Sequence, residues 1–183
     1  MKTAIFNLCV GRIQPHWKYC LKSQHDYCEK YGIDHYASER TIVNWRYSAN
    51  PAANFFFEKL QGLRLFSEGY DRVLYLDADI LITPHAKNIF EEYPDPAKYY
   101  GYDESQEVGI LGETMYGDEK DVMDRDPYVE RVLSNTNHSF SWKKNDKGKY
   151  VYYNMGAMLL GKDAVDWLED QEKLLSFKDC ENI

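Results

Sequence analysis

The stretch RVLYLDADILIT, which runs from Arg72 to Thr83, decides how this sequence folds. Apolar, strand-forming residues lead up to Asp77, and Asp79 follows after one intervening residue. Because a strand projects every second side chain to the same face, both carboxylates are expected to point the same way as the chain leaves the sheet. Two adjacent carboxylates repel each other, and a divalent cation relieves this repulsion while it fills its other positions with water and phosphate oxygens. The stretch therefore predicts a strand that ends in a metal site.

The spacing of the two aspartates is a weak indication when it stands alone. The chain holds 16 aspartates, so chance gives about one such pair. Asp124 and Asp126 have the same spacing, but they lie in a polar segment and end no strand. Placement at the end of a strand therefore separates the first pair from the second, and a purely structural pair of aspartates is the alternative.

The segments around this stretch alternate between strand and helix patterns. Strands are predicted at 4–10, 33–37, 72–76, 98–102 and 149–161, and helices at 15–31, 53–68, 84–92 and 163–177. The first three strands with the two helices between them form half of a doubly wound sheet, in which ligands bind beyond the carboxyl ends of the strands. The sequence thus predicts an α/β fold with a mostly parallel nucleotide-binding sheet flanked by helices.

Composition narrows the class of protein. With 183 residues, the chain suits a single domain, and no apolar run is long enough for a secretory signal or a membrane span. Residues 91–130 carry 3 basic and 13 acidic side chains, which more than accounts for the net charge of -8 and argues against nucleic-acid binding. A soluble, cytoplasmic protein is expected. Its reduced, mostly buried thiols are predicted to be Cys9, Cys20, Cys28 and Cys180.

A second motif completes a resemblance to a known family. The strand with DADILI is followed about seventy residues later by YYNMGAMLL at 152–160. This pair of motifs resembles the glycosyltransferases of the GT-A fold, and the small stand-alone transferases encoded by some large algal viruses are similar in size. The resemblance covers roughly residues 3–177, and it would fit a virus-encoded enzyme in the host cytoplasm.

The resemblance implies a nucleotide-sugar donor, most often a UDP-sugar carrying a hexose or pentose, and a glycan or protein-linked glycan as the acceptor. It implies that the donor diphosphate binds through Mn2+ on the motif formed by Asp77, Ala78 and Asp79. Asp79 would ligate the metal directly, whereas Asp77 would reach the metal or the ribose. The chemistry agrees, because the chain has no glycine-rich phosphate loop, and Mn2+ or Mg2+ suits carboxylates and water better than Zn2+ does.

Further donor-site candidates are Cys9, Val10, Gly11, Arg12, Lys59, Arg64, Asn154 and Gly156. The first three end the first strand, where backbone groups would face the nucleotide, and an ordinary core with a turn is the alternative. The three basic residues would contact the diphosphate or the base, or they are surface charges. The last two resemble a sugar-site strand, because an amide can hold hydroxyls in two directions and glycine lets substrate approach the backbone. A strand bulge is the alternative there.

The catalytic residue is open at this point. An inverting enzyme needs a carboxylate base, and a retaining enzyme of this type often carries an aspartate-glutamine element after the asparagine-glycine strand. Asp170 is followed by a glutamine, as in such an element, although a solvated helix face is the alternative. Asp179 begins the segment DCEN, which resembles the element less closely. Related enzymes commonly supply a further histidine from a C-terminal segment, and no histidine follows His138. The chain is then a compact variant, a trimmed donor domain, or one domain of a longer protein.

Other classes of protein explain the sequence less well. A haloacid-dehalogenase-type phosphatase also ends a strand in two spaced aspartates, but it prefers threonine where this chain has Leu81. A nucleotidyltransferase would carry a glycine-rich, basic loop near its start. A non-catalytic module that binds a nucleotide-sugar or a carbohydrate is the remaining alternative, and a turnover assay separates it from an enzyme.

Overall fold

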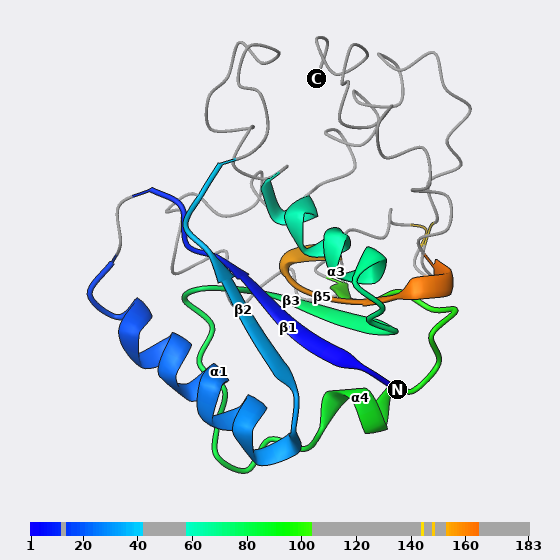
Figure 1. Ribbon diagram of the computed structural model, residues 1–183, viewed down its shortest axis with the longest axis horizontal. Helices are drawn as coiled ribbons and strands as arrows, with labels where there is room; N and C mark the ends of the chain where they lie inside the picture. The colour runs from blue at the N-terminus through cyan, green and yellow to red at the C-terminus, as the bar shows by residue number, and fades with distance from the viewer. Residues whose placement is uncertain (12–13, 42–57, 104–143, 145–147, 149–152, 165–183) are drawn as a thin grey trace, which may run out of the picture. The chain divides into compact units, whose positions relative to one another are not determined.

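The computed structural model describes residues 1–11, 14–41, 58–103, 144, 148 and 153–164 (Figure 1). The chain divides into two compact units, one formed by 1–100 with 156–181 and the other by 101–155 with 182–183. The organisation as a single domain stays a prediction. In the part of the chain that the structure describes, no helix is both long enough and apolar enough to cross a membrane.

Within the described residues, five strands form one mixed sheet in the order β2-β1-β3-β5-β4. The strands are β1 (Thr3–Leu8), β2 (Asp34–Ser38), β3 (Arg72–Asp77), β4 (Tyr100–Asp103) and β5 (Tyr153–Gly161). Strand β1 runs parallel to both β2 and β3, whereas β5 pairs antiparallel with β3. The α/β class is therefore confirmed, and the parallel half of the sheet is the part that the first three predicted strands form.

The helices are α1 (Trp17–Tyr31), the 3-10 helix η2 (Lys59–Leu63), α3 (Arg64–Ser67), α4 (Ile89–Glu92) and the 3-10 helix η4 (Lys162–Ala164). Helix α1 ends where the sequence predicts, because Gly32 adopts a left-handed φ of 65° and its N–H binds the Cys28 carbonyl. The predicted helix at 84–92 is wrong for its first half. Only its last turn is helical, and the Asn88 side chain caps that turn by accepting from the Phe90 N–H.

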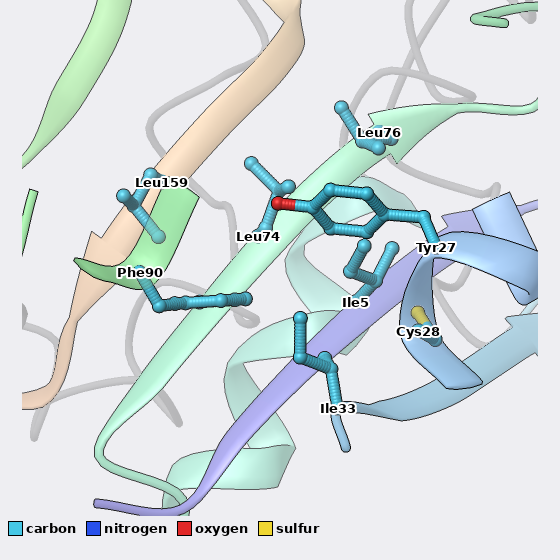
Figure 2. Packing of buried hydrophobic residues seen from close by; sticks show 8 residues of the cluster. All are labelled: Ile5, Tyr27, Cys28, Ile33, Leu74, Leu76, Phe90 and Leu159. Atoms are coloured by element: carbon cyan, nitrogen blue, oxygen red, sulfur yellow. The ribbon is translucent and has the colours of Figure 1, made fainter. Parts of the chain in front are cut away.

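The two faces of the sheet carry two separate apolar clusters. Alternate residues of β3 divide between them, so that Leu74 and Leu76 join one cluster while Val73 and Tyr75 join the other. Figure 2 shows the first cluster, in which Tyr27 of α1 and further side chains from α4, β1 and β5 meet on one face. Helix α3 covers the opposite face with Leu65.

The 3-10 helix η2 approaches β1 closely, because a glycine lies at the contact. A Cβ atom on Gly62 would stand 2.9 Å from Cδ1 of Phe6, so a larger residue would require the Phe6 side chain or the backbone of η2 to shift. This close approach carries the start of η2, and with it Lys59, to the face of the sheet that holds Tyr75. The glycine thus places a charged residue near the end of β3.

The cysteines that the structure describes are free thiols in the interior. Cys9, Cys20 and Cys28 are all buried, as the sequence predicts, and burial raises the pKa of Cys28 to about 12. Such a thiol stays protonated and unreactive at neutral pH. Cys180 lies outside the described residues.

A buried polar network crosses from β2 through β1 to α1. The Asn7 Oδ1 lies 2.5 Å from His35 Nε2, and the Asn7 Nδ2 donates to Gln24 Oε1 at 2.6 Å. Both Asn7 and Gln24 are fully buried. Burial, and then repulsion from His25, lowers the pKa of His35 below its usual 6.5.

The lowered pKa of His35 predicts that folding stability falls as the medium becomes more acid. Below pH 6.5 the unfolded histidine takes up a proton that folded His35 does not, so the unfolded state binds more protons. The contribution is complete above pH 6.5 and is lost as the pH falls through the lowered folded pKa. Urea unfolding at pH 7.5 and pH 5.5 measures this loss. The loss of unfolding free energy between these two pH values should be smaller in His35→Gln. It should stay unchanged in His85→Gln, which replaces an exposed histidine. Equal losses in both variants would contradict the assignment of the effect to His35.

Candidate functional site

The two aspartates lie in a tight turn at the carboxyl end of β3. The strand ends at Asp77, one residue later than predicted, and the Ile80 N–H donates to the Asp77 carbonyl at 3.1 Å. We call these four residues the Asp77–Ile80 turn. Ala78 is buried within it, whereas Asp79 is exposed. The end of the strand at this motif is thus confirmed. The alternation of side chains between the two faces of the sheet stops at Asp77, so the position of Asp79 is set by the turn and not by the strand.

Two side chains among the described residues hold the Asp77 carboxylate. Its Oδ1 lies 2.9 Å from the Lys59 ammonium and accepts from the Tyr75 hydroxyl at 2.5 Å. The Lys59 side chain is only 9% exposed, whereas the Asp77 side chain is 37% exposed, so solvent screens this ion pair from the side of the carboxylate. Burial, followed by the charge of Asp77, raises the pKa of Tyr75 above its ordinary value, and the hydroxyl therefore remains a donor.

The sequence suggests Lys59 as a contact of the diphosphate or the base, with a surface charge as the alternative. The structure pairs Lys59 with Asp77, and its contact with a donor stays a prediction. Tyr75 was missed, although its position two residues before Asp77 on the same strand was the available signal. The Lys59 Nζ also lies 4.9 Å from the centre of the Tyr75 ring, so the three groups form one cluster. This cluster fixes where the first carboxylate of the motif sits.

The donor set of the motif fits a hard cation. Asp77 and Asp79 offer only oxygen atoms, which suit Mn2+ or Mg2+ rather than Zn2+. Among the residues that the structure describes, no group of three or more histidine, cysteine, aspartate or glutamate side chains could hold a metal ion. A cation bound here by two carboxylates would keep positions for water and for phosphate oxygens, as Mg2+ commonly does in phosphate-transfer sites.

The end of β1 lies at the same edge of the sheet as this motif. Leu8, the last residue of β1, pairs in parallel register with Asp77, so the predicted residues Cys9, Val10 and Gly11 follow directly at that edge. The Cys9 N–H donates to the Ser38 carbonyl at 2.8 Å, which ties this segment to the end of β2. The carboxyl ends of three parallel strands therefore meet around the motif.

The remaining candidates differ in what the structure says of them. Gly156 precedes Ala157, which pairs with Leu76, so this glycine lies beside the end of β3. Asn154 belongs to β5 as predicted, in the second compact unit. Arg64 begins α3 with an exposed side chain, which favours the surface-charge alternative. The candidates outside the described residues are Arg12, Asp170 and Asp179.

No protein-family model matches this sequence, and no curated protein sequence matches it. Among solved structures, the chain is similar to a glycosyltransferase involved in the glycosylation of the major capsid of PBCV-1, with a TM-score of 0.51 and 17% identity over 96% of this chain and 67% of that one. It is also similar to mouse xyloside xylosyltransferase 1 in its apo form, with a TM-score of 0.49 and 12% identity over 96% of this chain and 72% of that one. The first likeness shows that the chain has a glycosyltransferase fold of the GT-A type.

Proposed function

We propose that the chain is a metal-dependent glycosyltransferase that moves a sugar from a UDP-sugar to a glycan acceptor. One observation carries the proposal: the two aspartates lie in a turn at the carboxyl end of β3, next to the end of β1, in a fold shared with a solved glycosyltransferase. Ligands of open α/β sheets bind at such ends.

Different groups of described residues would bind the metal ion, orient its ligand and contact the nucleotide. The exposed Asp79 carboxylate and the Asp77 carboxylate would hold Mn2+ or Mg2+, which stabilises the charge of the leaving diphosphate when it is bound. Lys59 and Tyr75 keep Asp77 oriented toward the end of the sheet. The backbone after β1 supplies N–H and carbonyl groups for the nucleotide.

The transfer itself requires a group that accepts a proton. The acceptor hydroxyl oxygen bonds to the anomeric carbon, the bond from that carbon to the diphosphate oxygen breaks, and the hydroxyl proton passes to a base. Asp170 and Asp179 stay the candidates for this base or for a group near the anomeric carbon.

Thermal unfolding with UDP tests the donor half of the proposal. UDP with Mn2+ should stabilise the chain by about 2.7 kcal/mol at a ligand concentration of 100 Kd, whereas UDP in EDTA should not. GDP with Mn2+ is the matched control for the base. Equal stabilisation by UDP in EDTA would contradict the proposal that UDP binding depends on a metal ion.

A screen of nucleotide-sugars with Mn2+ tests the enzymatic half. Transfer to water or to an added glycan is expected with at least one UDP-sugar, and released UDP is the measured product. If the chain bound UDP with Mn2+ but released no UDP from any donor, it would be a donor-binding module instead of an enzyme.

A further inference from the structure

One face of α1 carries side chains that hydrogen-bond to the backbone after β3. Residues 78–88, which connect β3 to α4, form turns and irregular structure and so cannot pair their own backbone groups in a ladder. The helix supplies partners at successive turns along this face. The side chains concerned are Cys20, Ser23, Gln24, Tyr27, Lys30 and Tyr31.

Gln24 binds both ends of the Asp77–Ile80 turn. Its Nε2 donates to the Ile80 carbonyl at 2.7 Å and to the Asp77 carbonyl at 3.2 Å. The Asp77 carbonyl also accepts the Ile80 N–H that closes the turn. Gln24 is fully buried, so the two carbonyls and the amide would each lose a partner in the interior if these bonds broke.

The orientation of the Gln24 amide is set from the sheet. The Gln24 Oε1 accepts from the Asn7 Nδ2 at 2.6 Å, and the same Nδ2 donates to the Leu76 carbonyl at 2.8 Å. Because the oxygen faces Asn7, both Nε2 hydrogens face the turn. The side chain therefore cannot rotate without leaving buried groups unpaired.

Two further contacts from α1 hold the same part of the chain. The Cys20 thiol donates to the Asp79 carbonyl at 3.3 Å, and the Ser23 hydroxyl accepts the Ile82 N–H at 3.0 Å. Together with Gln24, the helix thus binds the carbonyls of Asp77, Asp79 and Ile80. The backbone that separates the two carboxylates is fixed by a helix more than fifty residues earlier in the chain.

We infer that Gln24 is a positioning residue for the metal site, acting through the backbone of the Asp77–Ile80 turn. This inference rests on the proposed function. A cation with a strict coordination geometry binds two carboxylates tightly only if their separation is set before it arrives, because ordering a loose turn would cost conformational entropy. Gln24 sets the separation of the carboxylates by binding the backbone carbonyls of the turn, without touching the metal or the donor.

Gln24→Met tests the inference, because methionine fills a similar volume and donates no hydrogen bond. The Kd of Mn2+, measured at a fixed saturating concentration of UDP, should rise about tenfold, because losing outer partners of metal ligands lowers metal affinity by this order. The spectrum of bound Mn2+ in electron paramagnetic resonance should broaden as its surroundings become heterogeneous. Isothermal titration calorimetry well below the unfolding temperature of each variant gives the Kd.

Tyr31→Phe is the matched control. Tyr31 donates to the Ala86 carbonyl at 2.8 Å from the same helix, so this variant also loses a hydrogen bond to the irregular segment, but away from the turn. Its stability should fall while the Kd and the Mn2+ spectrum stay unchanged. If Gln24→Met does not fold, Cys20→Ala, which removes the bond to the Asp79 carbonyl, should raise the Kd in the same direction by a smaller factor.

The outcomes separate this inference from the proposed function. A wild-type chain that shows no Mn2+-dependent binding of UDP overturns both. Binding by the wild type with an unchanged Kd in Gln24→Met, or in Cys20→Ala where that variant replaces it, overturns the inference alone. An equal rise in the Kd of Tyr31→Phe overturns it too, since the effect would then be one of general stability.

Discussion

Replacing Asp79 by alanine is expected to abolish the stabilisation that UDP gives in the presence of Mn2+. Asp79 is the exposed carboxylate of the motif, whereas Asp77 already contacts Lys59 and Tyr75. Without Asp79, the cation would keep one carboxylate that also serves an ion pair. Because a divalent cation and the diphosphate bind together, loss of the cation removes the binding of the nucleotide as well.

The size of this effect follows from linkage. At 100 Kd the ligand stabilises by about 2.7 kcal/mol, which corresponds to a rise in the unfolding temperature of about 5–11 °C for a chain of this length. Asp79→Ala should lose all of this rise while the variant alone unfolds near the wild-type temperature, because the side chain is exposed. Differential scanning fluorimetry with UDP, Mn2+ and EDTA measures both quantities.

Asp126→Ala is the control for the motif, since Asp124 and Asp126 repeat the same spacing in a polar segment. This variant should keep the full response to UDP and Mn2+. If stabilisation by UDP and Mn2+ survived in Asp79→Ala, or disappeared equally in Asp126→Ala, the proposed metal site at the end of β3 would be contradicted.

Replacing Leu74 by alanine is expected to cost about 2–5 kcal/mol of folding free energy. Leu74 lies in the middle of β3 and is only 3% exposed. Its neighbours in register are Ile5 of β1 and Leu159 of β5, and all three join the cluster in Figure 2. Removing its side chain leaves a cavity at the centre of the sheet, where strands on both sides restrict relaxation.

Leu81→Ala provides the comparison, because Leu81 is the same residue type with 59% of its surface exposed. That variant should change stability by no more than about 0.5 kcal/mol. The free energy of unfolding in urea, measured by circular dichroism, gives both values. A similar small cost at Leu74 would mean that this face of β3 is not packed as described.

The strand that carries the motif was predictable because its signals are local. An apolar run of strand-forming residues up to Asp77 predicts β3, and Gly32 predicts the end of α1, since only glycine adopts a left-handed backbone without a steric cost. The placement of the aspartates after a strand rather than in a polar segment separates Asp77 from Asp124. These features need neighbours in the sequence and nothing else.

The helix predicted at 84–92 shows where local signals fail. The pattern there allows a helix, but the backbone up to Asn88 instead takes partners from α1, such as the hydroxyls of Tyr27 and Tyr31 on the carbonyls of Lys87 and Ala86. Tertiary hydrogen bonds outweighed a weak local preference, and only the last turn became α4. A pattern along the chain does not contain these partners.

The sequence alone determined the α/β class, the strand that leads to Asp77, and the oxygen-only donor set that suits a hard cation. Tertiary structure decided how that motif is held: Lys59 and Tyr75 orient Asp77 on one face of the sheet, and Gln24 binds the turn from the other. The physical reason is range. Strand and helix preferences act between close neighbours, whereas a buried amide and an ion pair act between segments that only the folded chain brings together.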